Sequence, residues 1–276
     1  MSHSDPTATE PTQDTLAVAP DDVHENDRVA LADARLDGWF QFETGELFKG
    51  FPVNHADHVL DIGSGDGGLA GFCAKLCASV CCVDIDHQRL DATLQRLRHN
   101  AIGDVEGIHA RADQLPIASA SKNRIICTEV LEHVPIPAAV LREAHRVGTD
   151  DALYLLTVPD ARSEALQKQV AEPAYFQEPN HIRVYTREQF SDEVRQAGFD
   201  IVEHLSFGFY QSMWLTFYWL SDKTDINDRS HPLLRSWDHT WALFNQTPQA
   251  EAARRALDEL MPRTQLIIAR KSRVPA

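Results

Sequence analysis

The sequence is poor in basic residues and in long apolar runs. It contains 26 Lys and Arg residues against 41 Asp and Glu residues, so the formal net charge is −15, and no Lys/Arg-rich stripe interrupts this acidic balance. Such a surface repels a phosphate backbone, so we expect no nucleic-acid partner. The most aromatic stretch, residues 207–220, also contains Gln and Ser and is about fourteen residues long. It is too short and too polar to cross a bilayer, so we expect no transmembrane segment.

Signals for disulfides and for secretion are also missing. The cysteine count is five, an odd number, and no charged-then-apolar leader precedes them, which predicts a reducing, cytoplasmic location. Cys73 and Cys77 are one helical turn apart, whereas Cys81 and Cys82 are neighbours on an expected strand and face opposite sides of it. This spacing favours buried thiols over a metal cluster. We therefore expect no metal site.

What the sequence does contain is a glycine loop after an apolar run. Residues 59–68 are Val-Leu-Asp-Ile-Gly-Ser-Gly-Asp-Gly-Gly, a pattern that predicts a strand, a tight turn and the start of a helix. A second apolar run ends at Asp84, about twenty residues later. Glycine lets a ligand approach the main-chain N–H groups, and an acid at the end of the next strand can accept both ribose hydroxyls. The sequence thus predicts a site for a ribose-bearing ligand.

The charge beside the loop bears on which ligand this is. The spacing Gly63-x-Gly65-x-x-Gly68, together with Asp84, also fits the dinucleotide fingerprint, so an NAD-dependent oxidoreductase is one alternative. Asp61 precedes the first glycine by two residues, where it would repel a pyrophosphate but suits an ammonium or sulfonium group. The Tyr-x-x-x-Lys pair of many such oxidoreductases is also absent. These features favour a cationic ligand over NAD.

At these residues the chain resembles the class I methyltransferases that use S-adenosylmethionine. Their first motif is similar to residues 59–67, and their second motif ends in an acid like Asp84. Residues 110–116 and 124–135 resemble the third motif and the fourth strand with its following loop, which includes Leu-Glu-His-Val at 131–134. The resemblance implies S-adenosylmethionine as cofactor. Because no Asn-Pro-Pro-Tyr-type motif is present, we expect a small-molecule acceptor.

The resemblance also implies which residues bind the cofactor. Asp113 is expected to meet the adenine amino group and the backbone N–H of Ala112 the adenine ring, while Thr128 and Glu129 face the methionine portion. The full implied set is Asp61, Gly63, Ser64, Gly65, Asp84, Ile85, Ala112, Asp113, Gln114, Thr128, Glu129 and His133.

Three residues are candidates for catalysis. Methyl transfer is an in-line displacement that requires positioning and exclusion of water, and a special base is not always needed. If the acceptor is a hydroxyl, a histidine is the usual proton acceptor. His133 follows the fourth strand and is the first candidate, although its family counterpart more often shapes the methionine end of the cofactor site. His181 and Tyr185 are the others, and a structural role for His181 is an alternative.

Alternation of strand and helix patterns predicts a doubly wound α/β fold. We expect a seven-stranded, mostly parallel sheet with an antiparallel last strand, covered by helices on both faces. The expected strands are residues 58–63, 79–85, 107–111, 124–130, 153–159, 200–206 and 265–269. Helices are expected at residues 68–76, 88–99, 138–147 and 187–197. Thr186 and Gln189 form the capping-box pattern at the start of the last of these helices.

The segments outside this core define the expected domain organisation. We expect a disordered tail at residues 1–27, a helical cap at 28–50, the methyltransferase core at 51–207, an aromatic-rich helical substrate cap at 208–263, and the last strand and tail at 264–276. Trp39 and Phe40 either line the site or plug the side of the domain.

The aromatic stretch has three open interpretations, which are packing of the insertion, lining of an acceptor pocket, and a partner face such as a homodimer interface. A protein that binds an adenosyl ligand without turnover is a second functional alternative. The acceptor's identity and the atom that is methylated stay open.

Overall fold

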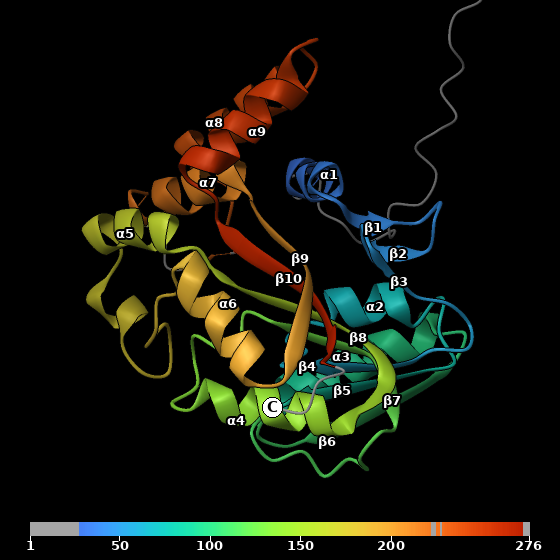
Figure 1. The fold of residues 1–276 in the computed structure, drawn as a ribbon. Coiled ribbons are helices and arrows are strands. Elements are labelled where there is room, and N and C mark those ends of the chain that lie inside the picture. Colours follow the sequence, from blue (N-terminus) through green and yellow to red (C-terminus); the bar gives the residue numbers. More distant parts are fainter. Residues whose placement is uncertain (1–27, 222–224, 227, 273–276) are drawn as a thin grey trace, which may run out of the picture.

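The computed structural model describes residues 28–221, 225–226 and 228–272; the expected disordered tail, residues 1–27, lies outside them. Their centre is a seven-stranded sheet with the order β6-β5-β4-β7-β8-β10-β9 (Figure 1). Strand β10 pairs antiparallel with both of its neighbours, and the other neighbouring strands pair in parallel. The predicted α/β fold is confirmed. The strands are β4 (His58–Ile62), β5 (Ser79–Asp84), β6 (Asp104–His109), β7 (Lys122–Thr128), β8 (Gly148–Pro159), β9 (Phe199–Phe207) and β10 (Thr264–Lys271).

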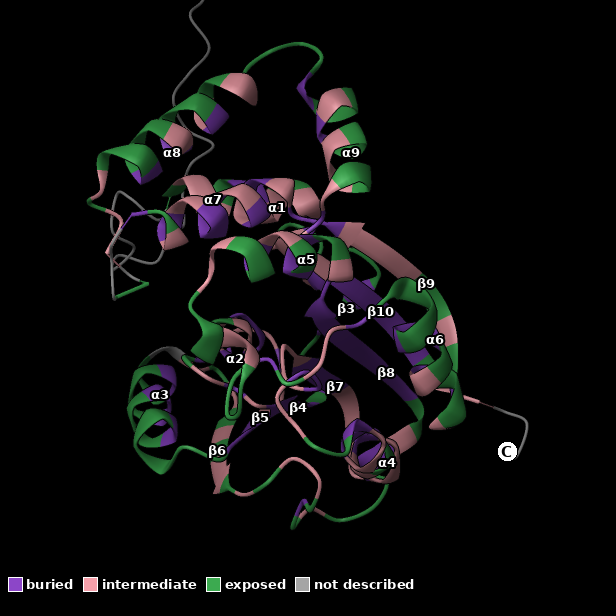
Figure 2. Cartoon of the chain, turned by 90° about the vertical axis from the view of Figure 1, so that its left-hand side faces the viewer, coloured by how far each residue is buried: buried purple, intermediate pink, exposed green. Residues whose placement is uncertain are grey.

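Helices cover both faces of this sheet. Because side chains alternate along a strand, Leu60 and Ile62 of β4 join one apolar core and Val59 joins the core on the opposite face. The first core includes side chains of α4 and α6, and the second includes side chains of α2 and α3. Figure 2 shows the buried strands between helices whose outer sides are exposed. These helices are α2 (Gly68–Cys73), α3 (His87–Asn100), α4 (Pro137–Val147) and α6 (Arg187–Gln196).

The start of α6 follows the sequence prediction closely. The Thr186 hydroxyl accepts a hydrogen bond from the Gln189 backbone N–H at 3.2 Å, and the Gln189 side chain accepts one from the Thr186 N–H at 3.0 Å. The predicted capping box is therefore confirmed. It holds α6 directly after the segment that carries His181.

The N-terminal cap is only partly helical, in contrast to the helices expected there. Helix α1 (Arg28–Asp37) is followed by three short antiparallel strands, β1 (Trp39–Gln41), β2 (Glu46–Phe48) and β3 (Phe51–Pro52). The helix cannot continue because Gly38 has a φ of 119°. Trp39 then packs against Phe48, with ring centroids 5.0 Å apart. The aromatic residues of this segment stabilise a small sheet instead of a second helix.

The insertion between β9 and β10 is helical, as predicted. It consists of α7 (Phe209–Trp219), α8 (Pro232–Phe244) and α9 (Ala250–Leu260), which gather with α1 beyond one end of β9 and β10 (Figure 1). Polar contacts join α1 to this group, because Trp241 Nε1 donates a hydrogen bond to Asp33 Oδ1 at 2.6 Å and Arg254 forms ion pairs with Asp33 and Asp37. The N-terminal helix and the insertion thus form one layer.

The aromatic side chains of α7 supply the core of that layer. Tyr210, Trp214 and Tyr218 are buried together with Trp241 of α8, and the rings of Trp214 and Tyr218 stack with centroids 5.9 Å apart. Packing is therefore the role that the structure shows for these residues. Helix α5 (Ala161–Val170) and the short 3-10 helix η2 (Pro173–Phe176) connect this layer to the sheet. Within the described residues, no helix is long and apolar enough to cross a membrane.

Candidate active site

A cavity of about 460 Å³ opens at the carboxyl ends of β4, β5, β6 and β7. This is the edge at which open α/β sheets bind ligands, and the volume lies within the usual range of about 300–1,000 Å³. Its lining consists of Gly63, Gly65, Val83, Asp84, Ile85, Arg89, Ala110, Arg111, Ala112, Asp113, Glu129, Val130, His133, Val134, Pro135, Glu178 and Pro179.

The glycine loop beside the cavity requires glycine at two positions. Gly63 has a φ of 72°, and a Cβ atom there would lie 2.4 Å from Val130 Cγ2. Gly67 has a φ of 71°, and a Cβ atom there would lie 2.4 Å from Thr93 Cγ2. A side chain at either position would be strained and would collide with a β-branched residue. Glycine at both positions is therefore needed for this loop conformation, in which the backbone can lie close to a ligand.

Asp84 links the glycine loop to the cavity wall. Its Oδ2 accepts a hydrogen bond from the Gly65 backbone N–H at 2.8 Å, and its Oδ1 accepts one from the Asp86 N–H at 2.9 Å. A carboxylate offers about four acceptor positions, so two backbone bonds leave others for ligand hydroxyls. Asp84 lines the cavity, which is the arrangement expected for an acid that binds a ribose.

Asp113 lies at the same cavity, with Ala112 and Ile85 as apolar neighbours in the lining. Arg111 donates two hydrogen bonds to Asp113, from Nε at 2.9 Å and from Nη2 at 2.7 Å. This side-chain pairing lowers the pKa of Asp113. Apolar neighbours beside a carboxylate whose pKa is lowered can take a flat ring that carries an amino group.

Asp61 lies behind the glycine loop and is not among the cavity-lining residues that the described structure shows. It is 2% exposed. Burial raises the pKa of Asp61 to about 7, and the hydrogen bond from the Ala70 backbone opposes this rise. The structure thus places this carboxyl group between β4 and α2, and direct contact with the cofactor stays a prediction.

Replacing Asp61 with Asn is expected to stabilise the ligand-free protein at about pH 8. The pKa of Asp61 rises from 3.8 to about 7 on folding, so the folded state loses stability as the pH rises through that interval. A shift of this size corresponds to roughly 4 kcal/mol. Urea unfolding at about pH 4 and pH 8 measures the difference, which should vanish at the lower pH. Asp66→Asn, at an exposed position, is the control; equal pH dependence in all three proteins would contradict the assignment.

The opposite end of the cavity is formed by the residues that follow β7 and β8. Glu129 has a φ of 53°, and its carboxylate accepts a hydrogen bond from the Thr157 hydroxyl at 3.0 Å. His133 Nδ1 lies 3.1 Å from the carbonyl oxygen of Pro179, which also lines the cavity. Burial and, secondarily, the neighbouring His181 lower the pKa of His133. The His133 imidazole is therefore neutral near pH 7.

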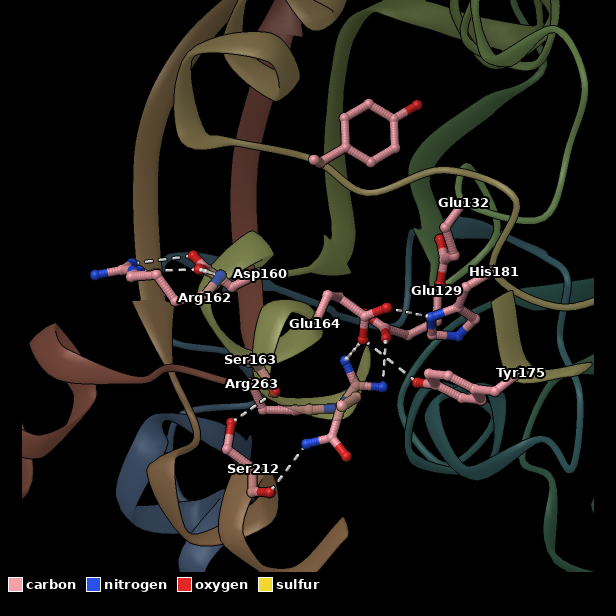
Figure 3. A network of polar contacts seen from close by, with 12 residues as sticks. Glu129, Glu132, Asp160, Arg162, Ser163, Glu164, Tyr175, His181, Ser212 and Arg263 are labelled. Carbon is pink, nitrogen blue, oxygen red and sulfur yellow. Dashed lines mark hydrogen bonds and ion pairs between the residues drawn. The ribbon is translucent and has the colours of Figure 1, made fainter. Parts of the chain in front are cut away.

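A buried polar network continues from this end of the cavity (Figure 3). Arg263 reaches Glu129 Oε2 through Nη2 and Glu164 Oε1 through Nη1, with both separations 3.7 Å. Glu164 Oε2 accepts a hydrogen bond from His181 Nδ1 at 2.9 Å. The His181 ring lies against Tyr175, with centroids 4.3 Å apart. Residues from the segment after β7, from α5, from η2 and the segment after it, and from the end of the insertion therefore meet beside the cavity.

The structure brings together most of the residues expected at the cofactor site. Those that line the cavity are Gly63, Gly65, Asp84, Ile85, Ala112, Asp113, Glu129 and His133. In the described part of the chain, Asp61, Ser64, Gln114 and Thr128 do not belong to this lining. Their contact with the cofactor stays a prediction.

Two of the three catalytic candidates are neighbours. His133 and His181 have ring centroids 5.0 Å apart. Tyr185 belongs instead to the core on one face of the sheet, with its ring against Phe190, and it is not among the described residues that line the cavity. The structure argues against a catalytic role for Tyr185, because its side chain points into the core beside α6. Trp39 and Phe40 are likewise absent from the described lining of this cavity.

Several residues of the site were not identified from the sequence. Glu132 stands next to His133 within Leu-Glu-His-Val, so its position in that motif was an available signal. Glu164, Tyr175, Glu178 and Arg263 carried no such signal, because they lie outside the motifs and reach the site through α5, the loop after it and the end of the insertion. The five cysteines are all free and buried, and burial raises the pKa of Cys77 and Cys81 to about 11.

This sheet, with a glycine loop after β4 and an acid at the end of β5, defines the class I fold of S-adenosylmethionine-dependent methyltransferases. Residues 27–204 match the methyltransferase domain family, and the chain belongs to it. It is a methyltransferase that uses S-adenosylmethionine. The family match therefore favours a methyltransferase over the two alternatives, an NAD-dependent oxidoreductase and a protein that binds an adenosyl ligand without turnover.

Relatives with described roles support the same class. The ubiquinone biosynthesis O-methyltransferase of Neisseria meningitidis serogroup A is 26% identical over 185 residues, which are 63% of this chain and 77% of that protein. The protein of the same name from Pseudomonas aeruginosa is 36% identical over 104 residues, 36% of this chain and 44% of that protein.

Solved structures share the fold. An S-adenosylmethionine-dependent methyltransferase from Mesorhizobium loti superposes with a TM-score of 0.54 at 14% identity, covering 80% of this chain and 93% of its own. A geranyl diphosphate methyltransferase superposes with a TM-score of 0.54 at 14% identity, covering 79% of this chain and 73% of its own.

Proposed function

We propose that this methyltransferase transfers the methyl group to a hydroxyl group of a small, apolar or aromatic acceptor. The observation that carries the proposal is the cluster of Glu132, His133 and His181, in which His133 lines the cofactor cavity. Imidazole and carboxylate groups beside the reacting atoms can take up a hydroxyl proton. The match to a relative named as an O-methyltransferase supports the same choice.

We assign cofactor binding to the residues at one end of the cavity and acceptor binding to those at the other end. We assign ribose binding to Asp84 and adenine recognition to Asp113 with Ala112. When bound, S-adenosylmethionine supplies a methyl group on a sulfonium, which reacts by in-line displacement. Val130, Val134 and Pro135 in the lining exclude water at the other end. Glu129 and His133 face the acceptor there.

Aromatic side chains beside the cluster support an apolar or aromatic acceptor. Tyr175 lies against His181 and also contacts Trp219 of α7, with ring centroids 5.2 Å apart. On this basis we assign residues 208–263 the role of a substrate cap. The cytoplasmic location and the homodimer stay predictions.

Two measurements test this function. Calorimetric titration with S-adenosylmethionine, S-adenosylhomocysteine and NAD in parallel is expected to show micromolar binding of the first two alone. Incubation with S-adenosylmethionine and an alkylphenol, the matching alkylaniline or the matching alkylbenzene then tests the acceptor atom by mass spectrometry. We expect the methyl ether of the phenol. Binding of NAD alone, or methylation of the aniline in preference to the phenol, would contradict the proposal.

A further inference from the structure

We propose that Glu132, His133 and His181 bind a divalent transition-metal cation, Zn²⁺ in the first instance, beside the cofactor cavity. One ligand atom from each of the three residues lies within 4.8 Å of the others. Two imidazoles and one carboxylate form a ligand set that suits Zn²⁺ and leaves further coordination positions open. The proposal replaces the sequence-based expectation that the chain has no metal site.

The Glu132 carboxylate is the first reason for this proposal. Its side chain is 0% exposed, and neither carboxylate oxygen has a hydrogen-bond partner among the described residues. A buried, unpartnered carboxylate is costly, because it has lost water and gained nothing in return. Among the described residues, the contact found for Glu132 Oε1 is with Nε2 of the neutral His133 imidazole at 3.7 Å, too far for a hydrogen bond. A cation held between them would satisfy both groups.

The hydrogen bonds of the two histidines are the second reason. His133 Nδ1 lies 3.1 Å from the Pro179 carbonyl oxygen, which can only accept, so Nδ1 carries the proton and Nε2 keeps its lone pair. His181 Nδ1 donates to Glu164 Oε2 at 2.9 Å, which leaves its Nε2 free in the same way. Histidines that bind metals nearly always donate their other ring nitrogen to a carboxylate or carbonyl. Both histidines have this arrangement.

The surrounding charges are the third reason. The guanidinium of Arg263 is shared between Glu129 and Glu164, at 3.7 Å from each. For Glu132, the contact found in the described structure is with the neutral His133 imidazole. One guanidinium, paired with two carboxylates, therefore lies in a region that also holds the carboxylate of Glu132 (Figure 3). A divalent cation at Glu132 would balance this excess of negative charge.

A metal at this place would also bear on the reaction, and this step rests on the proposed function. His133 lines the cofactor cavity, so an open coordination position can receive the acceptor hydroxyl. Binding to a cation lowers the pKa of a hydroxyl. Because the metal occupies the Nε2 lone pairs, activation of the hydroxyl by the cation takes the place of proton uptake by the imidazoles. The proton then leaves to water, the O–CH₃ bond forms as the S–CH₃ bond breaks, and the cofactor departs as the neutral thioether.

Metal binding is tested without cofactor or acceptor. Tag-free, metal-stripped protein is titrated calorimetrically with ZnCl₂, and CoCl₂ is used as a spectroscopic probe of the ligand geometry. We expect one Zn²⁺ per chain and visible absorption of Co²⁺ in a low-symmetry site, with no comparable binding of MgCl₂. Glu132→Gln and His133→Ala should each weaken Zn²⁺ binding at least 100-fold. The exposed pair His87 and Asp91 provides the control, and His87→Ala should leave the affinity unchanged.

The two proposals fail in different ways. Zn²⁺ affinity that is equal in Glu132→Gln and the parent protein would overturn the metal site, as would the absence of binding, and neither result affects cofactor binding or methyl transfer. Circular dichroism establishes that each variant is folded. Because His133 is only partly buried, its Ala variant keeps the test decisive if Glu132→Gln does not fold. Conversely, Zn²⁺ binding without methylation of the phenol would support the site and contradict the proposed acceptor.

Discussion

Replacing Asp84 with Ala is expected to weaken the binding of S-adenosylmethionine by about 2–4 kcal/mol, roughly 30- to 1,000-fold. The expected loss is large because Asp84 lines the cavity with a carboxylate that is held by two backbone N–H groups. An ionised acceptor that is already oriented forms strong hydrogen bonds with ribose hydroxyls. Calorimetry with S-adenosylmethionine and S-adenosylhomocysteine measures the change for both ligands.

The neighbouring carboxylate provides a matched control. Asp86 caps α3 by accepting a hydrogen bond from the Arg89 N–H at 3.0 Å, and it is not part of the cavity lining in the described residues. Asp86→Ala should lower stability by about 1 kcal/mol, as loss of a cap does, and leave the cofactor affinity unchanged. If Asp84→Ala bound both ligands as tightly as the parent protein, the assignment of Asp84 to the ribose would be wrong.

Replacing Arg263 with Met is expected to destabilise the folded protein by about 3–5 kcal/mol. Arg263 lies between Glu129 and Glu164 with its side chain 15% exposed, and its loss leaves these carboxylates without their shared counter-charge. For a chain of this size, the melting temperature should fall by roughly 6–20 °C. Thermal unfolding followed by circular dichroism measures the change.

Two further variants serve as comparisons for the stability of Arg263→Met. Arg263→Lys keeps the charge and should be considerably less destabilising than Arg263→Met. Arg255→Met removes an exposed guanidinium that pairs with Glu251, and its effect should stay below about 1 kcal/mol. Equal melting temperatures for Arg263→Met and Arg255→Met would mean that the buried network does not depend on Arg263.

The cofactor half of the site could be predicted from the sequence because its residues lie within a few positions of strand ends. Gly63, Gly65 and Asp84 follow buried strands, and adjacent parallel strands bring such ends to one edge of the sheet. The capping box at Thr186 is equally local, since both of its partners lie within one helical turn. Patterns of this kind can be recognised in a single sequence because the regular geometry of a helix or a strand fixes where the residues lie.

The acceptor half could not be predicted in the same way. Its network joins Glu129 after β7, Glu164 in α5 and Arg263 at the end of the insertion, which are far apart in the chain. Tyr185 shows the reverse error, because proximity in sequence to His181 did not bring its side chain to the cavity. A single β-bridge to Asp160 and packing against Phe190 of α6 placed it in the core.

The sequence by itself therefore determined the α/β fold, through short-range periodicity, and the methyltransferase class, through the resemblance of its motifs. The position of Asp84 at a strand end follows from the same periodicity, and its binding of ribose stays a prediction. Only the tertiary structure decided that neither oxygen of the buried Glu132 carboxylate has a hydrogen-bond partner among the described residues, and that Glu132 lies beside His133 and His181. Only the tertiary structure, likewise, placed Arg263, at the end of the insertion, beside Glu164. The physical reason is that burial and ion pairing are properties of the folded surroundings, and those surroundings are assembled from segments that only folding brings together.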